Sequence, residues 1–205
     1  MDGVDGCKVR VVIVPGNGCT PVDDCNWYSW VAEKLKARCG DKVEIILKDM
    51  PDPYGARETE WIPFIEEELI GRETNRDRVI LIGHSSGAVA ALRLLERGKL
   101  GAVVFVSVCW TDLGHKGEAA SGYYNRPFDW NTIKENATQR VLFGANDDPF
   151  IPWHEQEHVF ENIDAQVHAH HGRGHFMESK FPELVDEVER LIEVVGREKE
   201  EGEGN

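Results

Sequence analysis

The sequence predicts an α/β protein in which helices cover both faces of a mostly parallel sheet of about six strands. Two observations carry this prediction. Strand-like segments alternate with helix-like segments along the chain, and the strand-like segments are continuous apolar runs. Because a strand with one solvated face would alternate apolar and polar residues, continuous runs indicate strands buried on both faces, as in a three-layer α/β/α sandwich.

The expected strands share this apolar character and end at residues that favour turns. The first is dense in valine and isoleucine and stops at the Pro-Gly-Asn-Gly turn of residues 15–18. In chain order, the expected strands are Lys8–Val14, Val43–Leu47, Val79–Ile82, Ala102–Val108, Arg140–Phe143 and Gln166–His170.

In the expected helices, apolar residues recur every three or four positions, which places them on one helical face. We expect helices at Trp27–Ala37, Thr59–Ile70, Ser86–Arg97, Pro152–Asn162 and Phe181–Val195. Residues 111–136 mix glycine, proline and aromatic residues without such a period. We expect a loop with one short helix there.

Length and composition predict one domain, residues 1–195, followed by an acidic tail. The 205 residues are 41% hydrophobic and 29% charged, which suits a globular chain with a single core. Residues 196–205 have no apolar side chains to bury, so we expect this tail to be disordered.

The charge balance excludes two classes of partner. Lys and Arg number 23 against 37 Asp and Glu, a net charge of −14, so the basic face that nucleic acids and anionic membranes require is missing. The chain also has no run of about 18 apolar residues that would span a bilayer. We therefore expect no nucleic-acid partner and no membrane partner.

The cysteines predict a cytoplasmic location, with the nucleus as a further option. There are five, an odd number, and none forms a Cys-x-x-Cys pair, which favours reduced thiols. The first eight residues lack the basic and apolar regions of a secretory signal peptide.

The strongest chemical signal is the Gly-x-Ser-x-Gly motif of residues 83–87, Gly-His-Ser-Ser-Gly. It follows an expected apolar strand and begins an expected helix, which is the setting of a nucleophile elbow. A shift of the motif by one residue would require glycine at His84 and Ala88. The motif therefore selects Ser85, and not Ser86, as the candidate nucleophile.

A serine hydroxyl needs a base, and the base needs an orienting acid. In chains with this elbow the acid and the histidine follow the serine, each in a loop after a later strand. Asp147 and Asp148 follow the expected strand Arg140–Phe143, and His175 follows Gln166–His170. We favour Asp148, with Asp112 as a weaker alternative. In this triad Ser85 attacks, His175 takes the proton, and Asp148 fixes the imidazole tautomer.

The oxyanion hole of such a site needs two backbone N–H groups. One is expected from Ser86, at the positive end of its helix, and the other from Asn17 in the turn after the first strand. That turn has neither the Gly-x-Gly-x-x-Gly spacing nor the Gly-Lys-Ser/Thr of nucleotide sites. His168, His170, His171 and His175 come without a carboxylate–histidine motif, so we expect no metal, and we expect no cofactor.

Three tryptophans that follow strands or lie in residues 111–136 are candidates for the wall of an apolar pocket over Ser85. They are Trp110, Trp130 and Trp153.

Several spaced motifs together resemble the retinoblastoma-binding protein 9 family of small serine hydrolases, over roughly residues 9–195. They include Val-Pro-Gly-Asn-Gly at 14–18, Met-Pro-Asp-Pro at 50–53, the elbow motif, Asp-Asp-Pro-Phe at 147–150 and Gly-His-Phe at 174–176. The resemblance implies a minimal α/β-hydrolase fold and a triad at Ser85, Asp148 and His175. It also implies hydrolysis of small esters or amides, including amino-acid esters and aminoacyl arylamides.

The chain departs from this family at two places. Members that bind the retinoblastoma pocket carry Leu-x-Cys-x-Glu, whereas residues 69–73 here read Leu69-Ile70-Gly71-Arg72-Glu73. Because glycine replaces the cysteine, we do not expect that partner. The turn at 15–18 is followed by Cys19 and Thr20 in place of further glycines, and we expect these two residues at the edge of the cleft.

The sequence thus predicts a serine hydrolase that cleaves small esters or amides through an acyl-enzyme intermediate. The alternative is a protein-interaction module on a hydrolase fold, with weak or no catalysis, because a fold alone does not establish a function.

Overall fold

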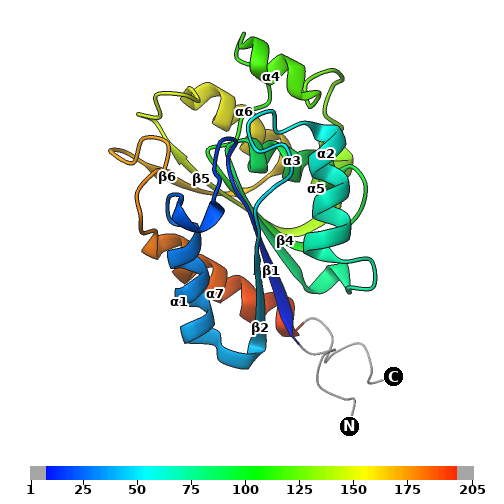
Figure 1. The fold of residues 1–205 in the computed structure, drawn as a ribbon, viewed down its shortest axis with the longest axis vertical. Helices are drawn as coiled ribbons and strands as arrows, with labels where there is room; N and C mark the ends of the chain where they lie inside the picture. Colours follow the sequence, from blue (N-terminus) through cyan, green and yellow to red (C-terminus); the bar gives the residue numbers. More distant parts are fainter. Residues whose placement is uncertain (1–7, 198–205) are drawn as a thin grey trace.

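The computed structural model describes residues 8–197, which form a six-stranded sheet with helices on both faces (Figure 1). All five neighbouring strand pairs are parallel, in the order β2-β1-β3-β4-β5-β6. The predicted three-layer α/β architecture is confirmed. The strands are β1 Val9–Val14, β2 Val43–Leu47, β3 Val79–His84, β4 Leu100–Val106, β5 Ala137–Ala145 and β6 Gln166–His170.

The helices cover the two faces of this sheet, except for the short α4, which lies at the top of Figure 1. They are α1 Tyr28–Cys39, α2 Glu58–Phe64, α3 Ser86–Leu95, α4 Lys116–Ser121, α5 Trp130–Glu135, α6 Trp153–Ile163 and α7 Pro182–Arg197. Four further segments are the 3-10 turns η2 Val22–Asp24, η3 Gly40–Lys42 and η5 Arg76–Arg78 and the π-helical η4 Ile65–Ile70, which continues α2. No helix within residues 8–197 is long and apolar enough to cross a membrane.

Successive residues of the central strands are buried on opposite faces, as the apolar runs predict, whereas the edge strands β2 and β6 are only partly buried. In β3, Ile80 and Ile82 join the hydrophobic cluster that contains α1 and α7, while Leu81 joins the cluster that contains α2, α3 and α6. Side chains of a strand alternate between its faces, so only an uninterrupted apolar run can fill both clusters.

The structure differs from the prediction mainly at element ends. Strand β4 stops at Val106 because Ser107 has a φ of 49°, outside the extended region. Residues 111–136 hold two short helices, α4 and α5, so the expectation of one was wrong. Helix α7 continues through Arg197, two residues into the predicted tail. The rest of that tail, residues 198–205, lies outside the described residues.

The strand order positions the site. From β1 the chain passes to β2 on one side and then to β3 on the other, so the loops after β1 and β3 diverge above the sheet. Such a reversal at the carboxyl ends of parallel strands leaves a crevice where ligands bind. The loop after β1 carries Asn17, and the turn after β3 carries Ser85.

Candidate active site

Ser85 lies on a sharp turn between β3 and α3, with φ 53° and ψ −119°. A Cβ on Gly83 would lie 2.4 Å from the carbonyl oxygen of Gly87, and one on Gly87 would lie 2.4 Å from the carbonyl oxygen of Val14. The two glycines are therefore required by close backbone contacts. The strained residue is Ser85, whereas Ser86 begins the regular helix.

His175 and Asp148 meet beside this turn. The ring Nδ1–H of His175 donates to Oδ2 of Asp148 at 2.8 Å. Asp148 is fully buried as a side chain, and that of His175 is 10% exposed. This contact fixes the tautomer in which Nε2 of His175 is the basic nitrogen, the arrangement that a serine nucleophile needs.

The carboxylate of Asp148 is saturated with hydrogen bonds. Its Oδ1 accepts from the backbone N–H of Phe150 (2.9 Å) and Ile151 (3.0 Å), and its Oδ2 also accepts from the hydroxyl of Ser107 (2.8 Å). Burial works against ionisation here, but the His175 contact and the two backbone donors outweigh it and lower the pKa of Asp148.

The other two candidate acids do not take this place. Asp147 is exposed, and Oδ1 of Asp112 accepts from the backbone N–H of Gly114 within its own loop. Of the three carboxylates, the structure brings Asp148 to the histidine.

His84, the residue before the nucleophile, connects the loop of His175 to Tyr28 through hydrogen bonds. Its Nε2–H donates to the backbone carbonyl of His175 at 2.9 Å, and its Nδ1 accepts from the hydroxyl of Tyr28 at 2.6 Å. The same hydroxyl accepts from the backbone N–H of Gly16 at 3.0 Å. Burial, with the nearby charge of His175, lowers the pKa of His84 to about 3, so it stays neutral and holds both loops in place.

The loop after β1 presents one backbone donor to the site. The N–H of Gly16 is taken by Tyr28, while Asn17 lines the cavity and its N–H has no partner among residues 8–197. Ser86 also lines the cavity, and as the first residue of α3 its N–H has no carbonyl one turn back. These are the two amides that the sequence indicates for the oxyanion hole.

Ser85, His175 and the two amide-bearing residues open into one cavity of about 660 Å³. Its inner wall is largely apolar and is formed by Val89, Cys109, Leu113, Tyr124 and Ile151. Trp110, Trp130 and Trp153 do not line it, so the expectation of a tryptophan wall was wrong. Trp110 instead stacks on His158, with ring centroids 4.0 Å apart. Cys19 lines the cavity and Thr20 does not.

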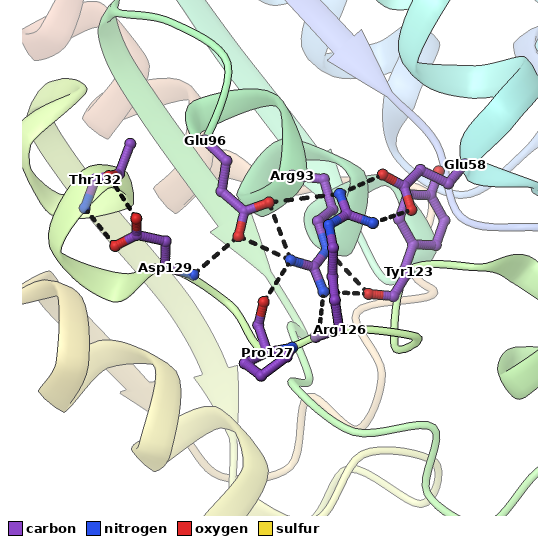
Figure 2. Close-up of polar contacts among 8 residues, drawn as sticks. All are labelled: Glu58, Arg93, Glu96, Tyr123, Arg126, Pro127, Asp129 and Thr132. Atoms are coloured by element: carbon purple, nitrogen blue, oxygen red, sulfur yellow. Dashed lines mark hydrogen bonds and ion pairs between the residues drawn. The ribbon is translucent and has the colours of Figure 1, made fainter.

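The segment that returns from α4 to α5 is anchored by Arg93, a buried residue of α3 (Figure 2). Its guanidinium donates to the backbone carbonyls of Tyr123, Arg126 and Pro127 and pairs with Glu96 at 2.8 Å. Because α3 begins at the elbow, this network fixes Tyr124, on the cavity wall, relative to Ser85.

The structure also adds residues that the sequence prediction missed: His84, Tyr28, Ser107 and Glu118, the last of which lines the cavity. Within residues 8–197, no three His, Cys, Asp or Glu side chains are placed to hold a metal ion.

Comparisons with known proteins identify the family of this chain. The sequence profile described as serine hydrolase matches residues 11–192. The chain belongs to the serine hydrolase family. It is 43% identical over 183 residues to the serine hydrolase RBBP9 of Rattus norvegicus, covering 89% of this chain and 95% of that protein. It is 27% identical over 159 residues to the putative hydrolase YdeN of Bacillus subtilis, covering 76% of this chain and 80% of that protein.

Two solved structures that superimpose on this serine hydrolase are less similar to it in sequence than RBBP9 is. The ydeN gene product of B. subtilis superimposes with a TM-score of 0.79 at 24% identity, over 90% of this chain and 98% of that chain. Arabidopsis thaliana SOBER1 superimposes with a TM-score of 0.63 at 12% identity, over 92% of this chain and 99% of that chain. These likenesses, with the parallel sheet, confirm the α/β-hydrolase fold.

Proposed function

We propose that this serine hydrolase cleaves small esters or amides through an acyl-enzyme intermediate, with Ser85 as nucleophile, His175 as general base and Asp148 as orienting acid. One observation carries the proposal: a buried carboxylate holds the ring of His175 at 2.8 Å in the same cavity into which the strained Ser85 opens. An oriented histidine beside a strained elbow serine serves acyl transfer.

The chemistry follows from these positions. The hydroxyl of Ser85 attacks the substrate carbonyl carbon as Nε2 of His175 takes its proton. The negative charge that develops on the carbonyl oxygen is stabilised by the N–H groups of Asn17 and Ser86. His175 then protonates the leaving group. Water, activated by the same histidine, releases the acid and restores Ser85. The step requires no cofactor.

The cavity supports small acyl groups, and the family resemblance of the sequence motifs implies amino-acid esters and aminoacyl amides among them. A volume of about 660 Å³ lies within the range of small-molecule sites. The four cysteines of the described residues, Cys19, Cys25, Cys39 and Cys109, are free thiols, which supports a cytoplasmic or nuclear location.

A retinoblastoma-type pocket protein is not a partner in this proposal. Such recognition would require an exposed Leu-x-Cys-x-Glu segment. Here Leu69 is 1% exposed and lies inside η4, and Gly71 replaces the cysteine.

A fluorophosphonate probe, which reacts covalently with activated serines, tests the proposal. We expect labelling of the wild type, loss of labelling in Ser85→Ala, and wild-type labelling in Ser179→Ala, which alters an exposed serine. A folded wild type that remains unlabelled would instead favour the protein-interaction module.

A further inference from the structure

The cavity contains an acidic group that the proposed mechanism does not use, the carboxylate of Glu118. Glu118 comes from α4, and among the described residues it is the only acidic one that lines the cavity. It is half-buried and forms no ion pair with any residue of 8–197. Burial raises the pKa of its carboxyl and the nearby His115 opposes this, so the charge is partly desolvated and only partly compensated by the described residues.

The position of Glu118 relative to the oxyanion hole is specific. The side-chain amide of Asn17 donates to Oε1 of Glu118 across 3.5 Å, a long contact, and the backbone N–H of Asn17 is one of the two proposed oxyanion donors. The carboxylate thus lies one side chain away from the place that the proposed function gives to the substrate carbonyl oxygen.

A substrate group attached to the carbon next to the carbonyl carbon would therefore lie close to Glu118. In an α-amino acyl group, the ammonium is attached to the carbon next to the carbonyl carbon, so it lies beside the carbonyl oxygen. The remaining substituent of that carbon, the amino-acid side chain, then has the apolar wall of Val89, Leu113 and Tyr124 available to it.

We propose that Glu118 binds the free α-ammonium group of the acyl part and makes the enzyme selective for esters and amides of unblocked α-amino acids. This inference rests on the proposed function. The half-buried carboxylate, which has no ion-pair partner among residues 8–197, gains a charged partner, and a charge-assisted hydrogen bond in a partly desolvated cavity is stronger than one in water.

The cations near the cavity suggest a competing specificity. His115 and Lys116 also line it, and a cation there would suit an acyl group that carries a carboxylate. Both side chains are exposed, at the start of α4, whereas Glu118 is half-buried and contacts Asn17. The observations therefore favour an ammonium over a carboxylate.

Matched p-nitrophenyl esters test the inference. The esters of phenylalanine, N-acetylphenylalanine, 3-phenylpropionic acid and succinic acid are compared in the wild type, Glu118→Gln and Glu161→Gln, with Ser85→Ala as the background. Glu161→Gln is the matched control because it removes one exposed carboxylate from α6. Comparing the phenylalanine to 3-phenylpropionate ratio of each variant with that of the wild type cancels the intrinsic reactivity that the ammonium gives the ester.

We expect the wild type to prefer the phenylalanine ester and to lose that preference when the amine is acetylated. In Glu118→Gln, the ratio of kcat/KM for phenylalanine over 3-phenylpropionate falls by about 10- to 100-fold, the amount for one hydrogen bond to a charged group. In Glu161→Gln the ratio is unchanged. Circular dichroism and thermal unfolding confirm that both variants fold.

Three results would overturn the inference. One is an unchanged ratio in Glu118→Gln, which includes the case of equal losses on both esters through a structural effect. Another is a preference for the succinyl ester that disappears in Lys116→Gln. The third is the failure of the proposed function itself, recognised by the absence of any Ser85-dependent hydrolysis of the four esters together with no fluorophosphonate labelling.

Discussion

The hydroxyl of Ser107 donates to Oδ2 of Asp148, the same oxygen that accepts the Nδ1–H of His175. Ser107 is fully buried and has a φ of 49°, so the chain leaves the extended region at the end of β4. The side chain of Ser107 therefore positions the acid of the proposed triad without touching the substrate.

We expect Ser107→Ala to lower kcat by roughly tenfold with little change in KM, because one of the hydrogen bonds to a buried carboxylate is lost and that contact is worth about 1.5–3 kcal/mol. Steady-state kinetics on a p-nitrophenyl ester would show this. Ser107→Cys, which retains a weak donor, should lose less. A change confined to KM would contradict a positioning role.

Asp148→Asn should lower kcat by about three to four orders of magnitude while the protein stays folded, because an amide in this place no longer fixes the tautomer of His175. The matched control is Asp147→Asn, which changes the adjacent exposed carboxylate and should retain activity. Kinetics and circular dichroism measure both effects. Equal activity of the two variants would mean that the acid lies elsewhere.

Tyr28→Phe should weaken both stability and catalysis. The hydroxyl of Tyr28 accepts from the N–H of Gly16 and donates to His84, so its removal leaves a buried donor and a buried acceptor unpaired. We expect a loss of about 1–3 kcal/mol in the free energy of unfolding, together with a lower kcat because the loop that carries Asn17 loses its anchor. Urea unfolding and kinetics test this. Tyr54→Phe, at an exposed tyrosine, should change neither quantity.

His84 predicts the pH dependence of stability. Its pKa is about 3 in the folded protein, against about 6.5 in the unfolded chain. Below pH 6.5 the unfolded chain therefore binds a proton that the folded protein does not, and stability falls as pH falls from 6.5 toward 3, by up to about 1.4 kcal/mol per pH unit. Urea unfolding at several pH values measures this slope.

The same experiment on His84→Gln isolates the contribution of this side chain. Between pH 6.5 and 4.5, the free energy of unfolding should depend less steeply on pH in the variant. The difference in slope should correspond to about one bound proton, or up to about 1.4 kcal/mol per pH unit. An identical slope in both proteins would show that His84 is protonated in the folded state or that other groups dominate this range.

The sequence predicted the parts of the molecule that local pattern determines. The apolar runs predicted a sheet that is buried on both faces. The spacing of glycines around Ser85 predicted the nucleophile turn, because close backbone contacts require those glycines. Asp148 and His175 followed from their order behind later strands. The first two inferences use residues near one another in the chain, and the third uses the order of the strands along it.

The features that were missed depend on contacts between distant segments. His84 is only a variable position in its motif, and its role comes from Tyr28 and the carbonyl of His175, 56 and 91 positions away. Glu118 gains its meaning from Asn17, 101 positions away. Helix α5 did have a local signal, because Asp129 caps it by accepting from the N–H of Thr132.

Among the polar residues that hold residues 122–129 in place, Arg93 should be the one whose substitution lowers the free energy of unfolding most. Its buried guanidinium serves three backbone carbonyls and pairs with Glu96 (Figure 2). Arg93→Met therefore leaves the three carbonyls without this donor and leaves Glu96 with only the N–H of Asp129 and the guanidinium of Arg126. Breaking a buried pair in this way costs about 3–5 kcal/mol. Arg126→Met, which removes a half-exposed partner of Glu58, should cost under about 1 kcal/mol.

Hydrogen exchange and kinetics separate this anchoring role from a general loss of stability. In Arg93→Met, protection should fall further in residues 116–129 than in β3 and β4. The KM for ester substrates should also rise, because Tyr124 on the cavity wall is no longer held relative to Ser85. If protection falls evenly across the sheet and KM keeps its wild-type value, Arg93 supports the core and not the cavity. The less disruptive Arg93→Lys keeps one charge and should give smaller changes in the same direction.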